Sequence, residues 1–379
     1  MKIRGFTLIE LLAVIVILAI IALIATPIVL DIIEDSKNSS IKRSIELYGN
    51  AVENSVAKAQ LNGSVVPSGK YTTTDGKTLT NGETKIKVDY DGAKTVCDVY
   101  ISSEGTVSLK KCNVSDKTVE YTYGNKIYEN GDVVYFNVAS GTKCTSSDYM
   151  EANSNTGYNG INPSSEQTSC LKFYAFNDFG SDKLNLILDH NTTALIAWNS
   201  SASNVNGPSE EFLNKLNEYT KDWQGTETPS NYTMDQAGQT SNANYTIDYS
   251  TYKARLITAN EIATITGNTT FNETTASYYH WYYFDSKTDT ASTTCKRGDT
   301  SGCSYGWLYD RTSTNCTEYG CLNNSDQTTY GYWTASSIAD NTHHAWFVTC
   351  SGDVFRNTVA FSDHYGVRPV IEVLRSKLI

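Results

Sequence analysis

Charged side chains are scarce in this sequence, and basic ones are scarcer than acidic ones. Asp, Glu, Lys and Arg make up 19 % of the 379 residues, below the roughly 25 % of a typical soluble domain. Against 41 acidic residues stand 30 basic ones, which gives a net charge of −11, and residues 113–379 alone carry a net charge of −12. Because a large acidic region repels phosphate backbones, we expect no nucleic-acid partner. Abundant Ser, Thr, Asn and Tyr with so little charge fit an extracellular surface.

The sequence also lacks the residue patterns of a catalytic or cofactor site. It has no recognisable nucleophile–base pair, no glycine-rich phosphate loop and no array of metal ligands. The isolated Asp and His residues support no mechanism. We therefore expect no enzymatic activity, no catalytic residue and no cofactor.

Cysteine is absent from the first part of the chain and appears nine times from Cys97 onward. An exported chain keeps disulfides in oxidising surroundings, although eight cysteines already allow 105 connectivities. Zinc is the competing explanation for the cysteines of residues 295–321, but no pair has the two-residue spacing of a zinc site and the nearest histidine is His280. Neighbours in sequence suggest the pairs Cys97–Cys112, Cys144–Cys170, Cys295–Cys303 and Cys316–Cys321, with Cys350 left over.

Only one apolar run is long enough to cross a membrane. It extends over residues 6–30, and residues 11–30 alone would span about 30 Å as a helix. Lys2 and Arg4 precede it and should remain cytoplasmic. A standard secretory signal has an apolar region of only about 7–15 residues and a small-residue cleavage site, which do not fit here. Glu10 lies inside the run, where a charged side chain costs up to about 2.5–3.5 kcal/mol unless it is compensated.

The segment Gly5-Phe6-Thr7-Leu8-Ile9-Glu10-Leu11-Leu12 resembles the class III signal of type IV pilins and pseudopilins. The resemblance implies that a prepilin peptidase cuts after Gly5 and methylates Phe6. It also implies that the Glu10 carboxylate pairs with the terminal amine of a neighbouring subunit, and that Pro27 bends the helix. Other pilin subunits, the peptidase and the membrane are then the partners. Residues 1–5 would be the leader peptide and residues 6–62 the transmembrane and amphipathic pilin helix.

A smaller domain should follow this helix. Beyond Pro27, apolar residues recur every three or four positions and predict one buried face that ends before Gly63. The face consists of Ile28, Ile32, Ile41, Ile45, Tyr48, Val52, Val56 and Ala59. Residues 63–82 are expected to be a loop, and alternation at residues 84–90, 95–102 and 106–112 predicts a three-stranded antiparallel meander. A helix packed on a small antiparallel sheet over residues 63–115 also matches the pilin arrangement.

Residues 118–379 have a different texture, with short strands, turns and many aromatic residues. Two helices are expected at residues 209–224, capped by Ser209, and 259–266, opened by a capping box from Thr258 to Glu261. Several short motifs together resemble the C-type-lectin-like fold, and more narrowly its formylglycine-generating and phage variable-domain branches. They begin at Ala254-Arg255, Tyr305-Gly306-Trp307, Gly331-Tyr332-Trp333 and Gly366-Val367-Arg368. The whole chain is therefore predicted to be α+β.

The resemblance implies a ligand-binding surface near the carboxy terminus, between Trp333 and Arg368. Residues 346–348 and 359–361 should be strands joined by a turn at residues 351–353. The loops at residues 338–344 and 362–365 would then form a rim that suits a carbohydrate or protein ligand. Trp333, Trp346 and Arg368 are expected to be scaffold residues, and no metal is assigned to His343 and His344. The candidate ligand-binding residues are Asp340, Asn341, His343, Arg356, Asp363 and His364.

These patterns favour a minor type IV pilin that carries a C-type-lectin-like adhesion module on the cell surface. The protein would reside in the cytoplasmic membrane before assembly and in the extracellular pilus afterwards. One alternative is a pseudopilin of a type II secretion or DNA-uptake machine. Another is a copper oxidase similar to formylglycine-generating enzymes, since Cys316 and Cys321 have a similar spacing. The context of that pair departs from the enzymes, and a structural disulfide is favoured.

Overall fold

The computed structural model describes residues 8–149, 169–191, 195–240, 242–285, 303–309, 331–349, 352–361 and 365–378. It consists of two compact units, Met1–Ile127 and Tyr128–Ile379. The division falls later than Thr118, because the strand and loop that follow this residue still pair with the first unit. Each unit is described by itself.

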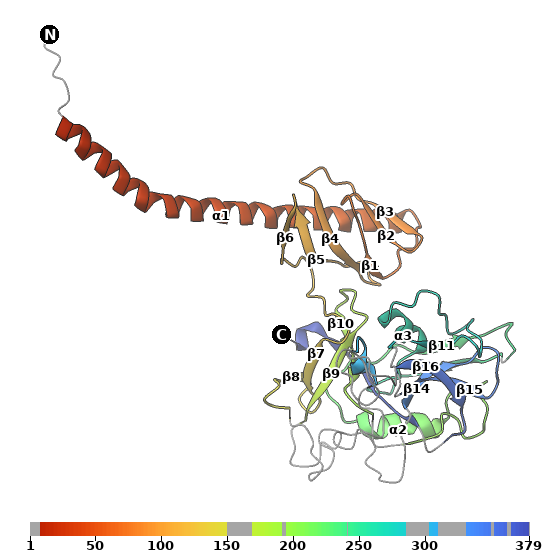
Figure 1. Ribbon diagram of the computed structural model, residues 1–379. Coiled ribbons are helices and arrows are strands. Elements are labelled where there is room, and N and C mark those ends of the chain that lie inside the picture. Colours follow the sequence, from red (N-terminus) through yellow and green to blue (C-terminus); the bar gives the residue numbers. More distant parts are fainter. Residues whose placement is uncertain are drawn as a thin grey trace, which may run out of the picture. The chain divides into compact units, whose positions relative to one another are not determined.

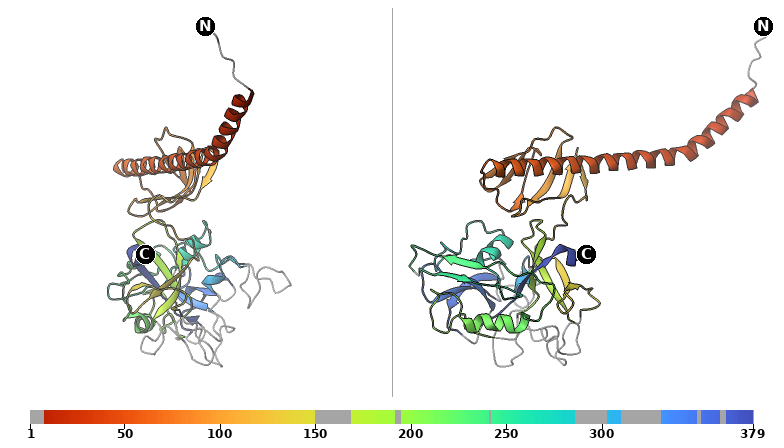
Figure 2. Two further views of the ribbon diagram at one scale, coloured as in Figure 1. Left: turned by 90° about the vertical axis from the view of Figure 1, so that its left-hand side faces the viewer. Right: turned by 180° about the vertical axis from the view of Figure 1, so that it is seen from behind.

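A single long helix, α1 (Leu8–Leu61), begins the first unit. Figures 1 and 2 show that it bends in its amino-terminal part, and Pro27 lies inside the helix. A proline removes one helical hydrogen bond and clashes with the preceding turn, which is a usual cause of such a bend. The hydroxyl of Thr26 also donates to the carbonyl of Ala22 at 2.6 Å, a contact that often bends helices. The helix ends before Gly63, whose φ of 78° lies in the left-handed region.

The carboxy-terminal half of α1 packs on a small antiparallel sheet, as predicted. The sheet has the order β1-β4-β5-β6, and Figure 2 shows α1 lying against one of its faces. Ile45, Tyr48, Val52 and Val56 of the predicted face are buried, whereas the earlier members Ile28 and Ile32 are exposed. The strands are β1 (Gly69–Tyr71), β4 (Thr95–Ile101), β5 (Val107–Val114) and β6 (Lys117–Val119).

The predicted three-stranded meander is wrong in its first strand. Strand β3 (Thr84–Lys87) pairs with β2 (Thr78–Asn81) in a separate hairpin rather than with β4. The edge beside β4 is taken by β1, from a segment that we expected to be a loop. The short hairpin forms because Gly82 takes a φ of 57° at its turn.

Two sheets form the second unit. The first has the order β18-β10-β9-β7-β8 and the second β13-β16-β15-β14-β17, in which only the β14–β17 pair is parallel. The first sheet contains β7 (Val133–Asn137), β8 (Thr142–Lys143), β9 (Cys170–Phe176), β10 (Lys183–Leu188) and β18 (Val370–Leu374). The second contains β13 (Tyr282–Tyr283), β14 (Gly331–Ser337), β15 (His344–Thr349), β16 (Asp353–Thr358) and β17 (Tyr365–Gly366).

Shorter elements complete the second unit. Strands β11 (Tyr232–Asp235) and β12 (Asn244–Ile247) form a separate hairpin. The 3-10 turns within the described residues are η1 (Gly306–Leu308), which precedes β14, and η3 (Arg375–Lys377), which follows β18. The prediction of a strand at residues 359–361 is wrong, since the strand after the turn is β16 and ends at Thr358.

Both predicted helices of this unit are present with their predicted caps. Helix α2 (Glu210–Thr220) begins after Ser209, whose hydroxyl accepts from the backbone of Phe212. Helix α3 (Ala259–Ile265) begins at the capping box between Thr258 and Glu261. Local side chains satisfy the first backbone donors of each helix, which is why the sequence alone located them.

Large aromatic residues fill the core, and one buried arginine ties its loops together. Trp198, Trp333 and Trp346 are fully buried. The Arg368 side chain, 1 % exposed, donates to the carbonyls of Leu188, Asp189, Trp307 and Leu308. The predicted scaffold role of Trp333, Trp346 and Arg368 is confirmed. Together with α1 and the sheets, this core makes the chain an α+β protein.

Candidate functional site

The amino-terminal part of α1 presents an apolar surface that no other element covers within the described residues. Its most apolar 18-residue window has a mean hydropathy of 3.2 and no buried residue. Leu12, Ile20 and Leu30 are each more than half exposed. An uncovered apolar helix of this length suits the hydrocarbon core of a membrane or the interior of a helical assembly.

Glu10 lies in the first turn of α1, at the amino-terminal end of this apolar surface. A negative charge near a helix amino terminus interacts favourably with the partial positive charge there. A membrane would nevertheless penalise the carboxylate. Gly5 and Phe6, the predicted cleavage and methylation residues, lie outside the described residues.

The structure places two residues of the predicted ligand rim on either side of one tyrosine. The Asp340 carboxylate accepts from the backbone nitrogen of Tyr278 at 2.8 Å, and Arg356 donates from Nε to the Tyr278 carbonyl at 3.3 Å. The Arg356 guanidinium also stacks on the Tyr278 ring, with 3.0 Å between its carbon and the ring centroid. Asp340 and Arg356 thus hold the segment that contains Tyr278.

Burial and neighbouring charge shift two groups at this rim. Burial, followed by the nearby Arg356 guanidinium, lowers the pKa of His344 below its ordinary value, and burial lowers that of Arg356. The His344 ring contacts the Tyr278 ring edge-on, with centroids 5.4 Å apart. His344 is therefore neutral near pH 7.

The other predicted rim residues are separated from this cluster or lie outside the description. The Asn341 side chain accepts from the backbone of His343 at 2.7 Å, and Nδ1 of His343 lies 2.5 Å from the carbonyl of Ala202. These contacts hold the β14–β15 loop against the segment before α2. Asp363 and His364 lie outside the described residues. Within the described residues, no group of three or more His, Cys, Asp or Glu side chains could hold a metal ion.

The comparison with protein families finds the prokaryotic N-terminal methylation motif at residues 1–26. This match covers Gly5, Phe6 and Glu10 and the apolar run as far as residue 26. The amino terminus is type IV pilin-like. No curated protein and no solved structure matches the chain, so the C-type-lectin-like resemblance of the second unit stays a prediction.

A pilin-like amino terminus explains why the two halves of α1 differ in their surroundings. Its amino-terminal part is long and apolar enough to cross a membrane, and the carboxy-terminal part packs on the sheet of the first unit. The motif implies processing by a prepilin peptidase and assembly with other pilin subunits. Before assembly, no neighbouring subunit covers the apolar part of a pilin-like helix, and the exposed apolar residues of α1 agree with this state.

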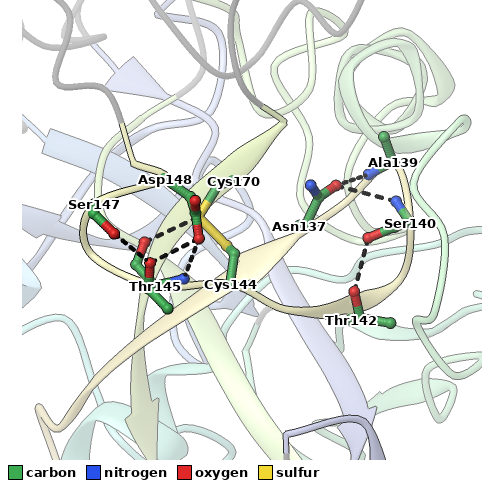
Figure 3. The surroundings of a disulfide bond; sticks show 9 residues. All are labelled: Asn137, Ala139, Ser140, Thr142, Cys144, Thr145, Ser147, Asp148 and Cys170. Carbon is green, nitrogen blue, oxygen red and sulfur yellow. Dashed lines mark hydrogen bonds between the residues drawn. A yellow bond between two sulfur atoms is a disulfide. The ribbon is translucent and has the colours of Figure 1, made fainter.

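Disulfides stabilise both units of this pilin-like protein, and two predicted pairs are confirmed. Cys97–Cys112 joins β4 to β5, with 4.1 Å between the Cα atoms. Cys144–Cys170 joins the loop after β8 to the start of β9, as Figure 3 shows. Cys303 is also disulfide-bonded. The remaining cysteines of the predicted pairs, and the unassigned one, lie outside the described residues: Cys295, Cys316, Cys321 and Cys350.

The loop at Cys144 is ordered by its own polar side chains. The Asp148 carboxylate accepts from the backbone and hydroxyl of Thr145 at 2.8 and 2.7 Å (Figure 3), and these bonds lower the pKa of Asp148. Asn137 accepts from the backbone of Ala139 and Ser140 in the adjoining turn. Local hydrogen bonds of this type are common in turns and fix the loop beside the disulfide.

Sequence reasoning missed a pocket in the second unit. It has a volume of about 470 Å³ and lies between the loop after α3 and the segment that leads into β13. Its lining residues are Asn268, Thr270, Phe271, Asn272, Thr275, Ala276, Tyr279, His280, Trp281 and Tyr282. The signal was present in the aromatic run at residues 278–284, of which Tyr279, Trp281 and Tyr283 are exposed. Exposed aromatic residues in such a run are unusual on a surface without a binding role.

Proposed function

We propose that the protein is a minor subunit of a type IV pilus-like filament and that its second unit is a binding module displayed at the cell surface. The observation that carries the proposal is the N-terminal methylation motif on a helix whose apolar part is uncovered. Helix α1 has the motif and the exposed apolar surface that membrane insertion and lateral packing require, whereas most residues of the chain belong to the second unit.

A minor role is favoured over a major one by the size of the second unit. This unit contains about twice as many residues as the first, which already holds the complete helix-on-sheet arrangement. Packing such a unit at every position of a helical filament would crowd neighbouring subunits. A subunit at the tip or at rare positions avoids that crowding and leaves the second unit accessible to a ligand.

Glu10 is the residue that we propose for registration between subunits. After cleavage behind Gly5, it would be the fifth residue of the mature chain, four residues from the new amine of Phe6. A carboxylate within an apolar helix gains most from a cation of a neighbouring subunit, because both charges leave water together only when the register is correct. The contact would then select the correct stagger of helices.

The proposal is tested with Glu10→Val and a matched control, Glu34→Val, which makes the same change at an exposed position farther along α1. Both variants should reach the membrane at normal levels. Glu10→Val should lower the amount of protein in sheared filaments by at least about tenfold, equivalent to ~1.4 kcal/mol at the assembly contact. Normal entry of Glu10→Val into filaments would contradict the registration role.

Immunogold labelling of intact filaments tests the minor role separately. Label at tips or rare sites supports it, whereas label at every lattice position would assign the chain as a major pilin. A processed chain that never leaves the cell envelope would instead favour a pseudopilin of a secretion or DNA-uptake machine.

A further inference from the structure

The pocket between α3 and β13 has a neutral, polar lining with aromatic edges. No Asp, Glu, Lys or Arg is among its described lining residues. Such a lining offers no counter-charge to an anion such as a phosphate or to a cation. Its amide and hydroxyl groups also disfavour a purely apolar ligand, since these groups would lose their hydrogen bonds to water.

Two aromatic residues provide flat surfaces beside these polar groups. Tyr279 is 79 % exposed and Trp281 is 38 % exposed. The Trp281 ring is braced edge-on by Phe355 and Tyr283, at centroid distances of 5.2 and 5.0 Å. A ring held in this way loses little conformational entropy when a ligand packs on it.

Asn268 and Asn272 line the pocket, and each side-chain amide contains a hydrogen-bond donor. Oδ1 of Asn268 accepts from the backbone of Thr270 and Phe271, and Oδ1 of Asn272 accepts from the backbone of Thr274. These bonds fix the side-chain oxygens toward the loop. Within the described residues, Nδ2 of neither asparagine donates to another group. Because both oxygens accept from the loop backbone and both residues line the pocket, their Nδ2 groups remain as donors for a ligand.

His280 adds a third directed donor. Its Nδ1 lies 3.4 Å from the backbone nitrogen of Ser277, which donates to it. In the neutral ring the proton is then on Nε2, which becomes a donor. The rigid, uncharged wall thus combines several donors with aromatic faces.

The pocket is anchored to the core and does not depend on a flexible surface loop. Phe271, in its floor, packs edge-on against the buried Trp346 at a centroid distance of 5.3 Å. Glu273, 4 % exposed, accepts from the hydroxyl of Tyr232 at 2.8 Å and from the backbone nitrogen of Asn260 at 3.0 Å, and it also accepts from the Ser336 hydroxyl. The loop that carries the asparagines is therefore held on three sides.

From this geometry we infer that the pocket binds a neutral saccharide, with the apolar face of a sugar ring on Trp281 and its hydroxyls on Asn268, Asn272 and His280. A sugar is the small-molecule class that combines a flat C–H face with many neutral hydroxyls. Asp340 and Arg356 are positioning residues, because they hold Tyr278 beside the pocket. The inference adds a ligand class to the proposed binding module but does not depend on filament assembly.

The test uses the full chain in micelles of an amine-oxide detergent, since sugar-headed detergents would compete. Isothermal titration calorimetry with maltotriose, cellotriose and triacetylchitotriose should give saturable binding of at least one of them. Trp281→Ala should raise the Kd by at least about tenfold, or ~1.4 kcal/mol, and Asn272→Ala should raise it as well. Phe361→Ala removes an aromatic residue of similar exposure outside the pocket, and it should leave the Kd unchanged.

Three outcomes would overturn the inference. They are the absence of binding by all three neutral sugars, unchanged binding by Trp281→Ala, and binding of an anionic sugar such as sialyllactose in place of the neutral ones. Saccharide binding and filament entry are measured separately, so Trp281→Ala should still enter filaments normally. Conversely, Glu10→Val should bind saccharide normally even where it fails to enter filaments.

Discussion

Removing the Cys144–Cys170 disulfide should destabilise the second unit alone, by an amount that follows from the length of the loop it closes. The two cysteines are 26 residues apart. For a loop of that length, the loss of chain entropy in the unfolded state corresponds to about 3.5 kcal/mol. A domain is typically stable by about 5–15 kcal/mol, so this is a large share. The double variant Cys144→Ala/Cys170→Ala should lower the midpoint of thermal unfolding by roughly 7–14 °C.

Tryptophan fluorescence makes the measurement specific to one unit. All six tryptophans of the chain, from Trp198 to Trp346, lie in the second unit. Urea unfolding of the full chain in detergent, followed by tryptophan emission, therefore reports that unit only. Alanine is used because Cys170 is 2 % exposed, and a serine there would bury a hydroxyl.

The matched control is Cys97→Ala/Cys112→Ala, which opens a loop of 15 residues in the first unit. The same relation gives about 3 kcal/mol for this pair. The loss should be seen by hydrogen exchange in α1 and β4, while the tryptophan transition stays in place. A loss below about 1 kcal/mol in the first variant would refute the loop-entropy argument. A shifted tryptophan transition in the control would refute the independence of the two units.

Three further substitutions test contacts that hold each unit together. Arg255→Met removes the cation that pairs with the partly exposed Glu261 and with the buried Glu372, which keeps only the more distant Lys183. It should cost about 3–5 kcal/mol in urea unfolding of the second unit; a loss under 1 kcal/mol would contradict the role of these ion pairs. Burial raises the pKa of Glu273 above 4.5, so wild-type stability should fall as pH rises from 4.5 through the folded pKa. Glu273→Gln should lose that dependence, and an unchanged pH profile would contradict it. Gly49→Ala would place a Cβ 2.5 Å from the Tyr123 ring. It should lower the stability of the first unit by about 1–3 kcal/mol, measured by faster hydrogen exchange in α1. Unchanged exchange rates there would contradict this prediction.

Features that depend on contiguous residues were predicted well from the sequence. The pilin-like amino terminus is a short run in which apolar length, charge and spacing all act locally. The caps of α2 and α3 are set by Ser209, Thr258 and Glu261, which bond to backbone groups within three residues. The Cys97–Cys112 pair was also accessible, because a tight hairpin brings its strands together.

Features that depend on distant contacts were predicted less well. The pairing of β3 with β2, and the capture of the β4 edge by β1, depend on which strands reach each other first and bury their apolar faces best. Local alternation predicts a strand but does not name its neighbour. Likewise, the contact that Asp340 and Arg356 share, Tyr278, lies 62 residues before Asp340 and 78 residues before Arg356, so no local pattern indicated it.

The sequence by itself determined that this chain begins with a type IV pilin-like apolar helix that carries Glu10 and that its larger second unit is acidic, because hydropathy, charge and capping are properties of short segments. Only the tertiary structure decided where an uncharged aromatic pocket forms, since its wall and floor come from a loop and a strand whose positions are fixed by Trp346, Glu273 and other distant residues. Packing and buried hydrogen bonds between remote segments create that surface, and no local pattern records them.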